Sequence, residues 1–600
     1  MKWLTNIFAI SALIVSVELF PLWYHAIKRI TFSENERKTV LNNGKIPTLN
    51  GFFIEPHHLF AENFYLYKVR AKRLLKHKWQ NDILRPSLSK YKDLRSALSV
   101  LVLYPSVEWG NSILMELIIL QMGFTFSVFL MYGALYKLFN DYRLAIFALF
   151  MIHLFTEGRV LREATTMWSY SLFVLLITVL NHSQINRSRR LVLLVWLLIF
   201  LIAGIDFRFL TFLFIFLSAY LAYLCFAHRI HFIKVIQWGS IWATAIVVWL
   251  VPNFVAQRYD SPDTIIRAGF LYPQFDAILE LKIWLGFIIK YFFDEKFILL
   301  LGLGIFFFFK KSLKRTLQPL LVLAFFLVIN LCISLVNRQQ TYANYHYLLS
   351  VKILFIVQLL CNLQKLIEQH RKRLLLVQAL TVMSLLYNVT INWFPLQLYK
   401  QMAVSQESEQ LIQYLKSQNT NSKTLATLSF EYNYLLAYHT DLELLLPSGF
   451  PLHNGNSNYE IVAQFLGICD LLKVNVLPAL EWCFPMEAYT AWQTKGKTYA
   501  QINMIPYLLL HCANIWQPFF IENVSFVQKW THKATWIVNP VIKSLFEHSV
   551  SFSDCYSQKP DFILLEEISS FLGAQVPDGY QLVFKAQHLK LYRIISHSKK

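Results

Sequence analysis

The feature that most constrains this chain is a long series of apolar blocks separated by short polar segments. The clearest blocks are 191–205, 209–226, 235–255 and 317–336. Each is roughly long enough for a hydrocarbon core of about 30 Å at about 1.5 Å per residue of helix. Of the 600 residues 56% are hydrophobic and the mean hydropathy is +0.41, which is too apolar for a soluble enzyme with buried helices. The sequence therefore predicts a protein that crosses a membrane many times.

The whole series predicts about eleven transmembrane helices within the first 395 residues. The first, 1–24, lacks a small-x-small cleavage site, so we expect it to stay as a signal anchor. The stretch 277–293 contains Lys282 and Lys290 and is predicted to lie at the membrane interface. The other expected spans are 113–136, 144–156, 168–181, 191–205, 209–226, 235–255, 295–309, 317–336, 348–364 and 374–395.

Basic residues alternate between the loops and predict the orientation of the chain. One set of loops is rich in Lys and Arg: 137–143, 186–190, 228–234, 310–315 and 364–373. The loops between them are less basic, which is the positive-inside pattern with a cytoplasmic N-terminus and an external C-terminal domain. The predicted external loop 25–112 is basic, but loops beyond about 60 residues translocate largely regardless of charge. We therefore expect a multi-pass protein of a bacterial inner membrane.

Two large external pieces follow from this topology. The loop 25–112 contains an amphipathic stretch, 64–79, with six basic residues; this pattern is typical of a helix on anionic lipid, and such a helix could also border a site for an anionic lipid-linked substrate. The tail, 396–600, is predicted to be a soluble mixed α/β domain. Its expected helices are 405–418 and 459–472, and its expected strand segments are 424–430, 442–446, 562–565 and the stretch 581–594. Residues 113–395 form the multi-span region.

Several kinds of site are excluded by the sequence. The net charge of +20 is concentrated between apolar blocks, which favours membrane lipid over nucleic acid as the partner. The seven cysteines have no metal-binding spacing, and there is no P-loop, GxGxxG, HExxH or GxSxG motif. If the tail is external, its four cysteines, Cys469, Cys483, Cys512 and Cys555, allow two disulfides of unknown pairing.

What remains for chemistry are ionisable residues at the predicted external edges of the spans. Charges near hydrocarbon are costly, so they tend to line sites, although each could equally be a helix-end residue or a local ion pair. Carboxylates there could act as bases or metal ligands, and arginines could clamp phosphate. These residues are Glu18, Glu62, Arg159, Arg162, Glu163, Asp206, Arg208, Arg338 and Lys352.

This arrangement resembles the GT-C class of membrane glycosyltransferases, and four patches are similar to the catalytic subunit of oligosaccharyltransferases. Residues 62–68 (ENFYLYK) resemble the family's DPYFNYR, and Tyr104-Pro105 before Gly110 resembles its WYPLG. Residues 162–170 (REATTMWSY) are placed like its RSxAGxxDNE, and 429–434 (SFEYNY) resemble its WWDYGY.

The resemblance implies a transfer of sugar from a polyprenyl-phosphate carrier at the external face. It implies that Glu62 is the catalytic carboxylate, as a base or a metal ligand. Arg162 and Arg338 would then bind the phosphate leaving group, while Glu431 and Tyr432 would shape an acceptor or carrier pocket. Ser169 and Tyr170 stand where the family has an acidic pair, which argues against a divalent cation held as in that family; we assign no metal ligands.

Two other functions stay open at this point. The missing acidic pair favours a non-catalytic membrane protein that keeps the fold and serves in envelope glycan assembly. A transporter is a third hypothesis, against which stand the large tail and the lack of two matching halves with broken helices.

Overall fold

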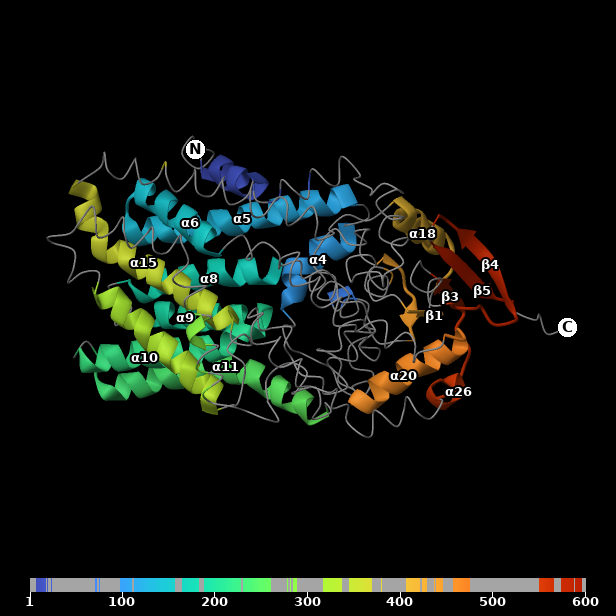
Figure 1. The fold of residues 1–600 in the computed structure, drawn as a ribbon. Helices are drawn as coiled ribbons and strands as arrows, with labels where there is room; N and C mark the ends of the chain where they lie inside the picture. Colours follow the sequence, from blue (N-terminus) through green and yellow to red (C-terminus); the bar gives the residue numbers. More distant parts are fainter. Residues whose placement is uncertain are drawn as a thin grey trace. The chain divides into compact units, whose positions relative to one another are not determined.

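The computed structural model is mostly helical, with one small mixed sheet (Figure 1). It describes residues 7–17, 98–109, 113–156, 164–182, 188–227, 230–259, 317–336, 345–369, 406–420, 423–428, 439–445, 457–474, 550–565, 573–587 and 589–595, with isolated positions 19, 23, 71, 72, 75, 278, 281, 284–286, 288, 379 and 436. Contacts divide the chain into two compact units, of which the first is Met1–Phe20, Asp93–Gln257 and Phe270–Pro395, and the second is Pro21–Lys92, Arg258–Gly269 and Leu396–Lys600.

The first unit is a set of packed apolar helices. Helices occur at nine of the eleven predicted spans, while the predicted spans 295–309 and 374–395 lie outside the described residues, apart from the isolated position 379. The helices are Ile7–Val17, α5 (Ile113–Phe139), α6 (Tyr142–Thr156), α8 (Ala164–Leu180), α9 (Arg189–Ile205), α10 (Leu210–Phe226), α11 (Phe232–Tyr259), Leu317–Val336 and α15 (Tyr345–Gln369). One further helix, α4 (Ser99–Trp109), lies inside the segment 25–112 and packs on α5, α8 and α9.

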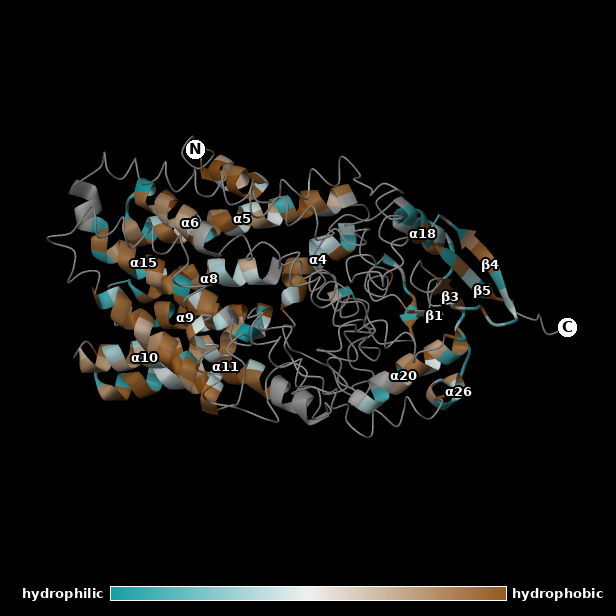
Figure 2. Cartoon of the chain, viewed as in Figure 1, coloured by the Kyte–Doolittle hydropathy of each residue, from teal (hydrophilic) through white to brown (hydrophobic). Residues whose placement is uncertain are grey.

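Four helices are long and apolar enough to cross a membrane, judged by length and composition within the described residues. These are Leu117–Phe139, Phe232–Val251, Leu317–Val336 and Tyr347–Gln364. Hydrophobic residues extend around most faces of these helices (Figure 2). On α11, for example, Ile236, Val247 and Val251 are exposed, which suits contact with lipid tails better than contact with water. The helices therefore have membrane character, and the full number of crossings stays a prediction.

Hydroxyl groups connect α5 to α8 in the interior of this unit. The Ser127 and Ser171 hydroxyls lie 2.8 Å apart, and Thr178 Oγ1 donates to the Ala134 carbonyl oxygen at 3.1 Å. Small polar residues are common between membrane helices because they allow close approach and cross-helix hydrogen bonds. The pairs 127–171 and 134–178 advance together along both helices, so α5 and α8 run in the same direction.

Tryptophans connect α9 to α11 in the same manner. Trp242 Nε1 donates to the Val192 carbonyl oxygen at 3.2 Å, and Trp249 Nε1 donates to the Phe200 carbonyl oxygen at 3.0 Å. These pairs also advance together, so α9 and α11 run in the same direction. At Gly204, near the end of α9, the Leu98 backbone N–H donates to the glycine carbonyl at 2.9 Å. A Cβ atom at Gly204 would lie 2.5 Å from Leu98 Cδ1 and from Trp249 Cζ2, so the packing of these two side chains on α9 depends on the missing side chain of the glycine.

Aromatic rings fill the interior between α8, α10, α15 and Leu317–Val336. Phe212 lies 5.2 Å from Phe173, 5.7 Å from Phe326 and 5.3 Å from Tyr347, measured between ring centroids. Tyr347 also donates from its hydroxyl to the Phe326 carbonyl oxygen at 3.2 Å, which satisfies the phenol in an apolar setting. These ring contacts stabilise the packing of the four helices on one another.

The second unit contains a five-stranded sheet with strand order β2-β1-β3-β5-β4. Its strands are β1 (Thr424–Thr427), β2 (Glu443–Leu444), β3 (Phe562–Leu565), β4 (Tyr580–Lys585) and β5 (Lys590–Ile594). The first three are parallel, whereas β5 is antiparallel to β3 and to β4. The predicted mixed α/β character is confirmed, and the stretch 581–594 forms a pair of strands, with Gly579 in the left-handed region (φ 91°) just before the first.

Two predicted helices accompany this sheet: α18 (Gln406–Ser417) and α20 (Asn458–Leu471). A capping box starts α20, because Ser457 Oγ accepts from the Glu460 N–H at 3.1 Å and Glu460 Oε2 accepts from the Ser457 N–H at 2.8 Å. The inner face of α20 packs with the buried strand residue Ile563 in one apolar cluster. A short helix, α26 (Phe552–Cys555), packs on the same helix.

Cys469 and Cys555 are free thiols, whereas Cys483 and Cys512 lie outside the described residues. Burial raises the pKa of the Cys469 thiol, and the neighbouring Asp470 carboxylate raises it further. Because the thiolate is the reactive form, we expect Cys469 to resist a maleimide at pH 8 in the folded protein and to react after denaturation. Peptide mass spectrometry would check this, with the half-buried Cys555 as the internal comparison. Rapid labelling of Cys469 in the folded protein would contradict the packing of α20.

Candidate functional site

Basic residues gather at one end of the described helices of the first unit. Two residues join α5 to α6, and short connections join α8 to α9 and α10 to α11, so each pair is antiparallel. Because α5 runs with α8 and α9 runs with α11, all three connections lie at one end. Basic side chains gather at that end: Lys137, Arg143, Arg189, Arg190 and Lys234. The start of α8 and the connection from α9 to α10 lie at the other end.

The connection between α9 and α10 is short, and Asp206 is its first residue. This residue ends α9 in extended backbone (φ −137°, ψ 96°), with its N–H still donating to the Ile202 carbonyl oxygen. A single 3-10 turn, η3 (Phe207–Phe209), then leads into α10. Asp206 is buried, with 1% of its surface exposed. A carboxylate buried in apolar surroundings is costly unless it is paired and hydrogen-bonded.

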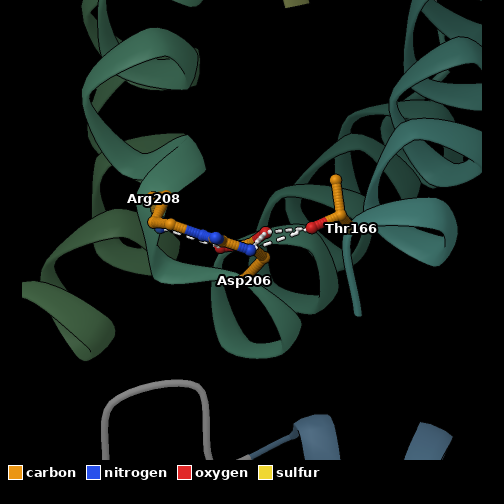
Figure 3. Close-up of polar contacts among 3 residues, drawn as sticks. All are labelled: Thr166, Asp206 and Arg208. Atoms are coloured by element: carbon orange, nitrogen blue, oxygen red, sulfur yellow. Dashed lines mark hydrogen bonds and ion pairs between the residues drawn. The ribbon is translucent and has the colours of Figure 1, made fainter. Parts of the chain in front are cut away.

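Arg208 and Thr166 supply those partners (Figure 3). Arg208 donates from Nε to Asp206 Oδ1 and from Nη2 to Asp206 Oδ2, both at 2.7 Å. The same Nη2 donates to Thr166 Oγ1 at 2.9 Å, and Thr166 Oγ1 donates to Asp206 Oδ2 at 3.3 Å. The Arg208 backbone N–H adds a bond to Oδ1 at 3.2 Å. A bidentate guanidinium–carboxylate pair of this kind is both strong and geometrically fixed.

This cluster is built for structure. Each carboxylate oxygen of Asp206 already accepts two hydrogen bonds, which occupies the positions that a general base would need. The pair also neutralises its own charge, so it offers no net attraction to an anion. Thr166 belongs to the first turn of α8, and the cluster therefore fastens the start of α8 to the α9–α10 break. Of the residues that the sequence singled out, Asp206 and Arg208 thus lie together in a cluster with a structural role. We call this cluster of Thr166, Asp206 and Arg208 the helix latch.

A second polar contact lies in the second unit and involves the predicted amphipathic stretch 64–79. Its described residues Ala71, Lys72 and Leu75 are helical, and Ala71 is buried. Lys72 Nζ donates to the Thr440 carbonyl oxygen at 2.9 Å and lies 3.4 Å from Asp441 Oδ1. The contact joins the segment that follows the resemblance patch 62–68 to the segment that follows the patch 429–434.

Two of the resemblance patches fall on described helices. Tyr104 and Pro105 lie inside α4, where the Tyr104 ring packs edge-on against Trp109 at 6.3 Å. Ser169 and Tyr170 are buried on α8, and the Tyr170 ring lies 5.1 Å from that of Phe209. The two positions where the family has acidic residues therefore belong to the packed interior. Among the described residues, no group of three or more His, Cys, Asp or Glu side chains could hold a metal ion.

The residues to which the sequence assigns direct roles lie outside the described part of the chain: Glu62, Arg162, Arg338, Glu431 and Tyr432. Glu18, Arg159 and Glu163 do so as well, whereas Lys352 is described and is buried on α15. Thr166 received no role from the sequence, although it lies in the resemblance patch 162–170, just before the predicted span 168–181. Sequence reasoning also missed the pairing of Lys72 with Asp441, since nothing in either segment predicts its partner.

Comparison with known proteins adds no family: no protein-family model matches the chain, and no curated protein matches it.

Proposed function

We propose that this chain is a membrane glycosyltransferase of GT-C type, which transfers a sugar from a polyprenyl-phosphate-linked donor to an acceptor at the external face of a bacterial inner membrane. The proposal includes about eleven membrane spans, a cytoplasmic N-terminus and an external tail. It rests on the resemblance patches, on the gathering of basic residues at one end of the helices, and above all on one contact.

That contact is the one between Lys72 and the Thr440–Asp441 turn. Two patches that are far apart in the sequence would have to meet in space for both to serve one active site. Lys72 lies ten residues after Glu62, and Thr440 lies nine residues after Glu431. The contact supports a shared site for these two patches, since it joins a residue that follows the first patch to residues that follow the fourth.

In this proposal Glu62 is the catalytic carboxylate and deprotonates the acceptor or holds a metal. Arg162 and Arg338 stabilise the phosphate leaving group through planar guanidinium groups. Glu431 and Tyr432 shape the acceptor or carrier pocket. The fixed latch of Thr166, Asp206 and Arg208 keeps the end of the helical unit rigid but carries no chemistry.

The first prediction for this function concerns Glu62→Gln, which removes the charge and the basicity while keeping the size of the side chain. We expect the variant to lose the glycan that a deletion strain lacks, because an amide neither accepts the acceptor proton nor binds a cation. Protein abundance should stay at the level of the parent. The measurement is a comparative glycan profile of the deletion strain complemented with parent or variant.

The second candidate function is a non-catalytic role in envelope glycan assembly, and the interior position of Ser169 and Tyr170 favours it. The two candidate functions predict different glycan profiles for a variant in which both Glu62 and Glu163 are neutralised. A wild-type glycan profile from that double variant would reject the catalytic proposal and leave the non-catalytic one.

A further inference from the structure

Helix α4 has an exposed apolar face opposite the face that packs on the helical unit. Leu101 is 65% exposed and Tyr104 is 43% exposed, and their spacing of three residues puts both on one side of the helix. Ser99, Leu103 and Ser106 are buried on the other side, where α4 packs on α5, α8 and α9. Large side chains gathered on an exposed apolar face are typical of a surface that binds a partner or a membrane.

The two ends of α4 are fixed by different parts of the helical unit. The Leu98 backbone N–H, just before α4, donates to the Gly204 carbonyl oxygen at 2.9 Å, so the helix begins beside the end of α9. Residues 110–112 alone separate Trp109, the last residue of α4, from the first residue of α5. The helix therefore leads from the end of α9 to the start of α5 (Figure 1).

These two ends lie at different levels along the helical unit. The hydrogen bonds between α5 and α8 join positions that are 44 residues apart, 127 to 171 and 134 to 178. The start of α8 at Ala164 is therefore level with residue 120 of α5, which is about 10 Å nearer to the basic end than the start of α5. Because Thr166 of α8 is bonded to Asp206, the nearby Gly204 lies at about the level of the α8 start. Thus α4 extends along the first two turns of α5.

This interval coincides with the expected edge of the hydrocarbon core. Lys137 lies in the last turn of α5, at the basic end. A core of about 30 Å that begins there spans about 20 residues of helix and ends near residue 117. The apolar span of α5 begins at the same place, at Leu117. Since that level lies between the two ends of α4, the helix crosses the interface between hydrocarbon and water.

The exposed face of α4 changes in polarity along this direction. Leu101 lies nearest to the end that contacts Gly204, Tyr104 follows, and Glu108 and Trp109 are at the outer end. The Tyr104 and Trp109 rings are in edge-on contact, with 6.3 Å between their centroids. Such rings suit a membrane interface, because one end of each is apolar and the other can hydrogen-bond. There is no Lys or Arg in α4, so attraction to anionic lipid is not what would hold it there.

We propose that α4 is an interfacial helix whose exposed face, Leu101, Tyr104 and Trp109, binds phospholipid in the leaflet opposite the basic helix ends, whatever the charge of the head group. The lipid-facing surface continues on α5, where Met115 and Met122 are exposed. The segment 25–112, expected as an external loop, thus returns to the membrane before α5 begins. The inference rests on the membrane span of the helical unit and does not depend on the proposed chemistry.

Photolabelling of the full chain in phosphatidylcholine vesicles tests this binding without any activity. Two diazirine phospholipids are compared, one reactive in the acyl chain and one in the head group, and peptide mass spectrometry locates the adducts. We expect the acyl-chain probe to label Leu101 as well as Met122, and the head-group probe to label Trp109. Tyr459 is the matched control, because it is an exposed aromatic residue of α20 in the second unit, and it should carry about tenfold fewer adducts than Tyr104.

Labelling of α4 no stronger than that of Tyr459, with normal labelling of Met122, would overturn the proposal. It would mean that water or protein, such as a second copy of the chain, covers the exposed face of α4. A head-group probe that labels Leu101 more than Trp109 would overturn the proposed direction of the helix.

Substitutions on the exposed face give a second, independent readout. Tyr104→Asp should lower the acyl-chain adducts on Leu101 about threefold or more, because a charge is costly near hydrocarbon. Tyr104→Trp should keep these adducts, and Met122 adducts in the same sample report whether the helical unit is intact. Addition of phosphatidylglycerol should change none of the adducts, since α4 carries no basic residue. Unchanged labelling of Leu101 in Tyr104→Asp, or labelling of α4 only with the anionic lipid, would contradict the proposal.

Discussion

Asp206→Ala is expected to destabilise the helical unit by about 3–5 kcal/mol, which is the usual cost of removing one partner from a buried ion pair. The change leaves the Arg208 guanidinium, 19% exposed, without the carboxylate to which it donates from Nε and Nη2. It also removes an acceptor of the Thr166 hydroxyl, so the start of α8 loses its attachment to the α9–α10 break. A denaturant titration of the purified protein in detergent would measure the loss.

The matched control removes both charges. Asp206→Ala combined with Arg208→Met should be less destabilised than Asp206→Ala alone, because no unpaired charge then remains in apolar surroundings. The single variant Arg208→Met completes the comparison. If the double variant loses as much free energy of unfolding as the two single variants lose together, the two charges act independently, which would contradict the described ion pair.

Gly204→Ala should also destabilise the helical unit, by about 1–3 kcal/mol, although alanine is the better helix former. A Cβ atom at Gly204 would lie 2.5 Å from Leu98 Cδ1 and 2.5 Å from Trp249 Cζ2. Trp249 cannot move away easily, because its Nε1 is bonded to the Phe200 carbonyl oxygen and its ring lies 5.1 Å from the Phe200 ring. The variant must therefore separate α4, α9 and α11, and the same titration would detect it.

Gly133→Ala is the control for helix propensity. Gly133 lies on α5, and a Cβ atom there would meet nothing within 4 Å. We expect this substitution to be neutral or to stabilise by about 0.5–1 kcal/mol, because it lowers the backbone entropy of the unfolded chain. Destabilisation by both glycine variants to the same extent would mean that Gly204 has no special packing role.

Periodicity and hydropathy predicted the helical segments well, because an apolar block has few alternatives to a helix in a membrane. The blocks 209–226 and 317–336 coincide with α10 and with Leu317–Val336. In the tail, the apolar run 562–565 (FILL) forms β3, which is buried along its whole length. Such local patterns are enough to predict a helix or a strand, because the apolar residues that must be buried are visible in the sequence itself.

Contacts between residues far apart in the chain could not be predicted from the sequence. Asp206 and Arg208 were noticeable because they interrupt two apolar blocks, but Thr166 comes from a different helix and carries no signal of its own. Lys72 and Asp441 are likewise far apart in the chain, and neither local sequence predicts the other as its partner. The direct candidates, from Glu62 to Tyr432, remain predictions that rest on the resemblance.

We propose that the helical unit spans a membrane with its basic helix ends in the cytoplasm and the tail outside. Alkaline phosphatase fused after Lys400 tests it most directly, with a second fusion after Asn186 in the basic connection between α8 and α9, both expressed in a bacterial host. We expect an active enzyme after Lys400 and an inactive one after Asn186. An inactive fusion after Lys400 with an active one after Asn186 would reverse the sides and contradict the proposed external site.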